Sequence, residues 1–169
     1  SNEGAIKQED LLPGQKVSVD HFICHTKGRL YTSKGKTQPE SMFSGGCMFV
    51  DHASGAVHVE HQVSLTTHET LQSKHRYEEK ARDCGVIVQN YLSDNRTAFS
   101  SADFAKDLAR FRQTTNFAGV GAHHHNGVAE RAIQTIMSMA RTMMLHAAIH
   151  WPDAADTALW PMAVDYAVY

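Results

Sequence analysis

Residues 16–24 have the sequence Lys16-Val17-Ser18-Val19-Asp20-His21-Phe22-Ile23-Cys24. Apolar residues alternate with polar ones around Val17, Val19 and Ile23, which predicts a β-strand. Two more strands are expected at residues 47–50 and 56–61, joined by a turn at 51–55. Together the three strands predict an antiparallel meander, with residues 25–45 as a loop or a long hairpin excursion after the first strand. That loop carries four basic residues that could contact phosphates, namely Lys27, Arg29, Lys34 and Lys36.

Helical and strand patterns then alternate along the chain. Thr66, with Glu69 three residues later, forms a capping-box signature and predicts a helix to about Asp83, stopped by Gly85. A continuously apolar strand, covered on both faces, is expected from residue 86 to 92. Ser100 or Ser101 is expected to cap a second helix, followed by a strand at 114–118. That helix should bury one apolar stripe, formed by Phe104, Leu108 and Phe111.

The longest helix is expected to begin at Asn126. Its apolar stripe should consist of Ala129, Ala132, Ile136, Met139, Met143 and Ala147. Trp151-Pro152-Asp153 is expected to end this helix and begin the next, with Trp151 and Trp160 as packing anchors. The order β-β-β-α-β-α-β-α-α predicts an α/β domain: a five-stranded mixed sheet with helices on both faces. We expect residues 1–15 to be an irregular lead-in and residues 16–169 to form one domain.

The length and composition of the chain limit the classes of protein to which it can belong. A chain of 169 residues suits one domain, and no apolar run approaches the roughly 20 residues of a membrane span. The net charge of −2 is unusual for a free-standing DNA-binding protein. The missing initiator Met and the unterminated helical pattern at the end suggest a fragment of a longer polypeptide, whose flanking domains would supply phosphate affinity. Three unpaired cysteines suit a reducing intracellular compartment.

Three acidic residues stand out by position. Asp20 lies inside a strand, Asp94 directly follows the apolar strand, and Glu130 lies near the start of the longest helix. A charge in a strand centre is costly unless a partner such as a divalent cation compensates it. Each acid also has an ordinary explanation. Asp20 could face water on an edge strand, Asp94 could begin a turn, and Glu130 could favour a helix N-terminus.

At these positions the sequence resembles retroelement integrases. Residues 91–95 (Tyr-Leu-Ser-Asp-Asn), followed by Phe99-Ser100, resemble the block that carries the family's second aspartate. The block at 125–132 (His-Asn-Gly-Val-Ala-Glu-Arg-Ala) closely resembles the copia-type block that carries the glutamate, and 35 residues separate Asp94 from Glu130. Residues 49–55, 140–147 and 151–152 are also similar to copia-type sequences.

The resemblance implies a ribonuclease H-like fold with Asp20, Asp94 and Glu130 as catalytic residues and as ligands of two Mg²⁺ or Mn²⁺ ions. It implies a polynucleotidyl transferase with endonuclease activity, which trims the 3′ ends of element DNA and joins them to target DNA. The implied DNA contacts are Asn95, His123, His124, His125, Asn126, Arg131 and Gln134. Implied partners are a second copy, through an apolar patch near Met144–Trp160, and the other integrase domains and reverse transcriptase of one polyprotein. The implied location is an element particle in cytoplasm and nucleus.

Two alternatives remain. A ribonuclease H-like nuclease would hydrolyse DNA without joining it, and fold alone cannot separate the two. A catalytically decayed core would act as a DNA-binding or oligomerisation module. Arg96 and Ala98 replace the residues usual in the family after the Asp-Asn pair, which favours that second alternative. The tract His123–His125 is expected to be a loop before the catalytic helix rather than a zinc site, since three adjacent residues do not easily converge on one ion.

Overall fold

The computed structural model describes residues 10–30, 38–95, 98–117 and 126–169. The order of strands and helices along these residues is the predicted one. The elements are β1 (Val17–Gly28), η2 (Pro39–Ser41), β2 (Phe43–Asp51), β3 (Val57–Gln62), α1 (Thr67–Asp83), β4 (Asn90–Ser93), α2 (Ala102–Arg110), β5 (Thr114–Phe117), α3 (Gly127–His150), η3 (Thr157–Leu159) and α4 (Trp160–Val168). No helix within the described ranges has the length and apolar character needed to span a membrane.

The strands form one mixed sheet in the order β3-β2-β1-β4-β5. β1 pairs antiparallel with β2, and β2 pairs antiparallel with β3, so the predicted meander is confirmed. β4 lies parallel to β1, and β5 lies parallel to β4. Because Ser18 of β1 pairs in parallel with Leu92 of β4, the C-terminal end of β4 lies beside the first half of β1.

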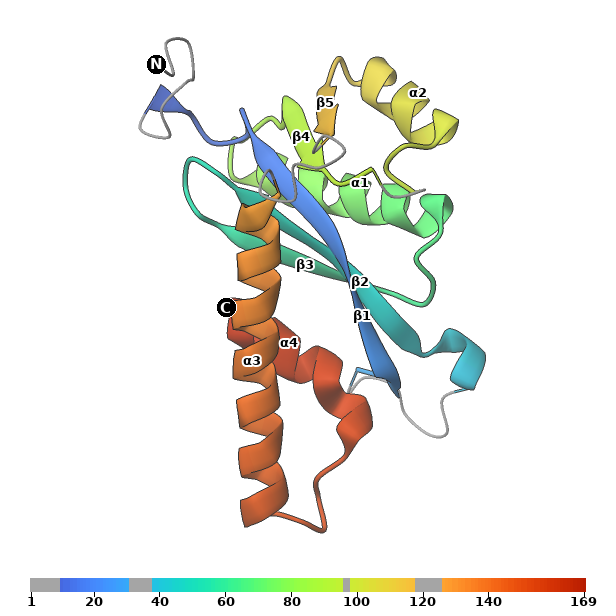
Figure 1. Ribbon diagram of the computed structural model, residues 1–169, viewed down its shortest axis with the longest axis vertical. Coiled ribbons are helices and arrows are strands. Elements are labelled where there is room, and N and C mark those ends of the chain that lie inside the picture. The colour runs from blue at the N-terminus through green and yellow to red at the C-terminus, as the bar shows by residue number, and fades with distance from the viewer. Residues whose placement is uncertain (1–9, 31–37, 96–97, 118–125) are drawn as a thin grey trace.

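Helices cover both faces of the sheet, as predicted (Figure 1). Successive side chains of a strand point to opposite faces. Val17 and Val19 therefore pack with Phe104 of α2 in one core cluster. Phe22 of the same strand packs on the opposite face with Trp160 of α4 in a second cluster. Full burial of a large apolar side chain contributes about 1.5–3 kcal/mol, so the two clusters fix the helices to the sheet.

The predicted helix caps form. Thr66 Oγ1 accepts a hydrogen bond from the Glu69 amide at 3.4 Å, and the Glu69 carboxylate accepts from the amides of Val63 and Ser64 at 2.8 and 3.0 Å. Ser101, rather than Ser100, caps α2 by accepting from the Phe104 amide at 3.2 Å. Gly85 follows α1 with φ of +75°, a conformation that costs glycine little.

Two predicted segment boundaries were wrong. The strand expected from residue 86 begins only at Asn90, because the Val86 amide donates to Ala81 O and completes the end of α1. Ile87 is consequently 70% exposed. The segment expected at 25–45 is the hairpin connection of the two alternatives, but it is shorter than expected, because β1 continues to Gly28, which pairs with Phe43 at the start of β2. Lys27 therefore lies in a strand, and Lys34 and Lys36 lie outside the described residues.

The chain end also differs from the prediction. Residues 152–154 form a turn rather than a helix start, and Pro161 instead lies in the first turn of α4. Asp156 Oδ1 accepts from the Ala158 amide at 2.9 Å and begins the short helix η3. Its other oxygen pairs with Arg29 at 2.9 Å, so this basic residue has a partner within the chain.

Several expected core residues are exposed. Phe111 follows the end of α2 and is 43% exposed, and Met139 of α3 is 47% exposed. Trp151 is 61% exposed, whereas Trp160 is buried as predicted. The indole of Trp160 donates to Thr26 O at 2.8 Å and packs edge-on against Phe22. The second half of α3 extends beyond the sheet in Figure 1, and Leu145 and Ile149 there are also exposed, whereas Ala140 is buried in the second cluster.

A buried polar network joins α1, α2 and β4. The Lys74 ammonium lies 2.8 Å from Glu78 and 2.7 Å from Asp107, and the Lys74 side chain is 1% exposed. The Tyr91 hydroxyl donates to Glu78 at 2.7 Å, and burial followed by the charge of Glu78 raises the pKa of Tyr91 well above its ordinary value. Burial raises the pKa of Asp107 as well, but hydrogen bonds from Lys74 and His75 outweigh this and leave that pKa below its ordinary value. Lys74 therefore links α1 to α2 through Asp107, and its partner Glu78 links α1 to β4 through Tyr91.

Candidate active site

Asp20 occupies the middle of the sheet. It lies in β1, opposite Met48 of β2, and is 6% exposed. One of its oxygens accepts a hydrogen bond from the His21 amide at 2.8 Å. Its position, two residues before Phe22, places it on the face that α3 and α4 cover. A carboxylate here is buried among strands, which confirms the expected strand position and excludes the exposed edge-strand alternative.

Asp94 directly follows β4, the parallel neighbour of β1. Val17 is aligned with Tyr91, and Ser18 is aligned with Leu92. Two further steps of this register align Asp20 with Asp94. Because adjacent strands lie about 4.8 Å apart, the register makes the two acids neighbours. The side chain of Asp94 is partly exposed.

Glu130 reaches the same region from the first turn of α3. The Asn126 side chain at the start of this helix makes no cap; its amide instead donates to Val19 O at 3.2 Å. This bond ties the start of α3 to the residue before Asp20. The carbonyl of Asn126 accepts from the Glu130 amide at 3.1 Å, and the Glu130 side chain is exposed.

The donor set suits a hard divalent cation. All three acids offer oxygen, which Mg²⁺ and Mn²⁺ prefer. Asn126 Oδ1 adds a buried oxygen that has no hydrogen-bond partner among the described residues. In the part of the chain that the structure describes, no three His, Cys, Asp or Glu side chains lie close enough to hold a metal. The structure therefore aligns the two aspartates, while the exposed Glu130 carboxylate does not complete a three-ligand group with them.

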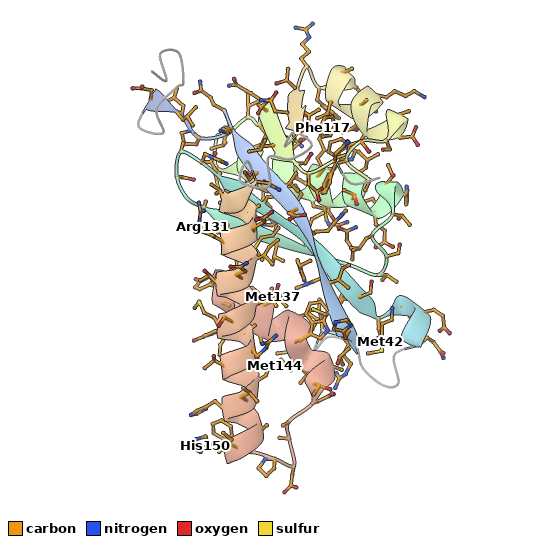
Figure 2. The ribbon with its side chains drawn as sticks, in the orientation of Figure 1. Met42, Phe117, Arg131, Met137, Met144 and His150 are labelled. Carbon is orange, nitrogen blue, oxygen red and sulfur yellow. The ribbon has the colours of Figure 1, made fainter. Side chains whose placement is uncertain are left out.

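The remaining predicted site residues differ in their exposure to solvent. Asn95, Arg131 and Gln134 are exposed, whereas Asn126 is 2% exposed and bonded within the protein. Arg131 lies near the end of α3 that crosses the sheet (Figure 2). The tract His123–His125 lies outside the described residues.

Sequence reasoning missed His52 as a neighbour of the site. Its Nε2 lies 2.7 Å from the hydroxyl of Ser18, two residues before Asp20 in β1. Burial, followed by the charge of Lys16, lowers the pKa of His52 below its ordinary value. Only the pairing of β1 with β2 brings these residues together, since they are 34 positions apart in the chain.

A separate apolar groove of about 730 Å³ lies between the end of β1, the second half of α3 and α4. Its lining includes Ile23, Met144, Leu145, Trp160 and Ala163 and contains none of the three acids. Met137 and Met144, labelled in Figure 2, lie along the part of α3 that borders it. The groove is therefore not the site of the carboxylate chemistry.

The arrangement of strands and helices is similar to that of solved integrase structures. The chain has the ribonuclease H-like fold of integrase catalytic cores. A magnesium complex of the HTLV-2 integrase catalytic core in dimeric form matches with a TM-score of 0.64 and 20% identity, covering 94% of this chain and 86% of that one. The trimeric form matches with a TM-score of 0.63 and 20% identity, over 94% and 84% of the two chains.

A third match is the simian T-cell lymphotropic virus intasome in complex with PP2A regulatory subunit B56 gamma. Its TM-score is 0.66 at 18% identity, and the match covers 94% of this chain but only 48% of that one. No family model and no curated protein sequence matches the chain. At these identities the likeness concerns the fold, and activity has to be argued from the residues.

Proposed function

We propose that this chain is the catalytic core of a copia-type retrotransposon integrase, which processes the 3′ ends of element DNA and joins them to target DNA. The observation that carries the proposal is the parallel pairing of Ser18 with Leu92, because two further steps of that register would bring Asp20 beside Asp94. Glu130 begins a helix that is bonded to β1 at the residue before Asp20. The integrase-core fold and the resemblance at residues 91–95 and 125–132 support the same conclusion.

In this proposal Asp20, Asp94 and Glu130 hold Mg²⁺ or Mn²⁺, two ions per site. Bound ions of this kind neutralise charge on a phosphodiester and lower the pKa of an attacking hydroxyl or water. Asp20 is held rigidly by the sheet, and Asn126 keeps the start of α3 beside it. Rigid placement of the ligands matters because phosphoryl transfer depends mainly on positioning and charge stabilisation.

One site serves both steps, because only the nucleophile changes. In end processing, water attacks phosphorus and the 3′-oxygen of the retained strand leaves with a proton as a 3′-hydroxyl. In strand transfer, that hydroxyl attacks a target phosphodiester, a new phosphorus–oxygen bond forms, and a target 3′-oxygen leaves. Strand transfer leaves the number of phosphodiester bonds unchanged and end processing is a hydrolysis, so neither step requires an external energy source.

A strand-transfer assay with labelled element ends and Mn²⁺ tests the function, with a branched DNA substrate for the reverse reaction. Glu130→Gln should lower both rates by about a hundredfold or more, the loss typical when a group that stabilises transition-state charge is removed. Glu79→Gln, an equally exposed helix glutamate on α1, is the matched control and should retain activity.

Other outcomes discriminate the alternatives. Hydrolysis of the labelled DNA without joining would contradict the integrase assignment and favour a ribonuclease H-like nuclease. Loss of every reaction, with DNA binding retained, would favour a decayed core.

The proposed DNA contacts at Asn95, Arg131, Gln134 and the His123–His125 tract follow from the resemblance. The resemblance also leads us to propose that the chain works with flanking integrase domains and with a reverse transcriptase of the same polyprotein. The proposed location is an element particle in the cytoplasm and nucleus.

The proposal includes a second copy of the chain bound at the groove. Leu145 on the groove wall is 58% exposed, and Ile149 on the same helix is 75% exposed. Contiguous apolar surface of this kind is typical of protein–protein interfaces.

Leu145→Glu should therefore shift the protein from dimer to monomer in analytical ultracentrifugation, because a buried unpaired charge is costly at an interface. Its thermal midpoint, measured at a concentration where the wild type is also monomeric, should change little because Leu145 is exposed. Leu12→Glu, which replaces a 66% exposed leucine away from the groove, should leave the dimer intact. A dimer that survives Leu145→Glu would place the interface elsewhere.

A further inference from the structure

Two histidines lie together at the far end of α3, away from the carboxylates. His146 and His150 are four residues apart, and their ring centroids lie 4.2 Å from each other at an interplanar angle of 42°. Residues four apart share one face of a helix. Both side chains are exposed, and His150 marks the free end of α3 in Figure 2. Solvent and ions therefore have access to both rings.

The surroundings favour a cation. α3 spans 24 residues, and its C-terminal end carries partial negative charge from carbonyl groups that lack helical partners. Residues 142–169 contain three aspartates, Asp153, Asp156 and Asp165, and no lysine or arginine. This stretch of the chain therefore contains no lysine or arginine that would repel a metal ion at the histidine pair.

We propose that His146 and His150 form a two-nitrogen site for a transition-metal ion such as Zn²⁺ or Ni²⁺. Imidazole nitrogen suits these ions, whereas the carboxylates of Asp20 and Asp94 suit Mg²⁺ and Mn²⁺. Because one helix carries both rings, binding at the first makes binding at the second intramolecular and raises the affinity. No third His, Cys, Asp or Glu in the described ranges joins the pair, so water fills the remaining coordination positions.

Trp151 provides a reporter for this site. Its ring centroid lies 6.2 Å from that of His146 and 5.8 Å from that of His150. Trp151 is 61% exposed, while the other tryptophan, Trp160, is 6% exposed and packed between α4 and the sheet. An open-shell ion held by the histidines should quench the fluorescence of Trp151 because it is in near contact, and should affect Trp160 less.

The test is titration with Ni²⁺, followed by calorimetry and by tryptophan fluorescence. Wild type should bind and show quenching. His146→Asn and His150→Asn should each weaken binding by about tenfold or more, because either change leaves a single ligand and abolishes chelation. Trp151→Phe should keep the heat of binding and lose most of the quenching. These residues are exposed, so the variants should fold like the wild type.

A control variant separates the pair from other ligands. His68→Asn, which removes an exposed histidine of α1 that lies beside Gln72, should bind Ni²⁺ as the wild type does. This variant touches none of the carboxylates of the proposed DNA chemistry, so its result is independent of that proposal. Equal Ni²⁺ affinity in wild type and His146→Asn would overturn the proposal. Quenching that survives Trp151→Phe would also contradict it, because the ion would then lie near Trp160.

Discussion

Asp20→Asn is expected to abolish binding of Mn²⁺ measured by calorimetry and, with it, strand transfer. Asparagine has the same size, and its oxygen can still accept from the His21 amide as Asp20 does at 2.8 Å. The substitution therefore removes charge and leaves the local geometry. A neutral amide is a much weaker ligand for a hard cation than a carboxylate.

The register of β1 and β4 makes the same prediction for Asp94→Asn, since both acids would belong to one metal site. Removing one of two neighbouring carboxylates also removes repulsion, so the metal-free protein should be as stable as the wild type or more stable. A lower thermal midpoint would indicate a structural role for Asp20 instead.

Asp103→Asn is the matched control, because the Asp103 side chain on α2 is 74% exposed and lies 4.0 Å from Lys106. It should bind Mn²⁺ as the wild type does. Equal Mn²⁺ binding by wild type, Asp20→Asn and Asp94→Asn would move the metal away from these acids and defeat the proposed mechanism.

Lys74→Met should cause the largest loss of stability, about 3–5 kcal/mol, because it leaves Glu78 and Asp107 without their shared counter-charge in the interior. A domain of this size has a total stability of about 5–15 kcal/mol, so the variant should be close to unfolding. Urea denaturation followed by circular dichroism measures the change.

Lys106→Met is the control for Lys74→Met, because the Lys106 side chain is 81% exposed; it should change stability little. The double variant Lys74→Met/Glu78→Gln should recover part of the loss, because glutamine can still accept from the Tyr91 hydroxyl without leaving a charge there. If Lys74→Met were as stable as the wild type, the network would contribute no net stability to the fold.

Much of the fold was predictable because its signals are local. Thr66 and Glu69 form their cap three residues apart, and the alternation around Val17 marks β1 within a few residues. The strand position of Asp20 and the helical position of Glu130 followed in the same way. The misplaced boundaries, at residue 86 and at Pro152, arose where a backbone hydrogen bond or turn overrode the local pattern.

Burial was less predictable, because it depends on what covers a side chain. Phe111, Met139 and Trp151 have the apolar character of core residues but are exposed, and the contacts of Phe111 with Lys74 and His75 of α1 leave it 43% exposed. Lys74 shows that polar residues can be buried by distant partners: lysine is rarely fully buried, yet Asp107, 33 residues away, makes the burial of Lys74 possible.

The sequence alone therefore determined the order of the elements, the mixed sheet and the three candidate acids, because each depends on residues close together in the chain. The tertiary structure decided that β4 pairs in parallel with the start of β1, two residues before Asp20, that Asn126 anchors the start of α3 to Val19, and that His146 and His150 lie at the end of a helix that extends beyond the sheet. The physical reason is that strand register and helix packing are set by contacts between segments far apart in the chain, which no local pattern specifies.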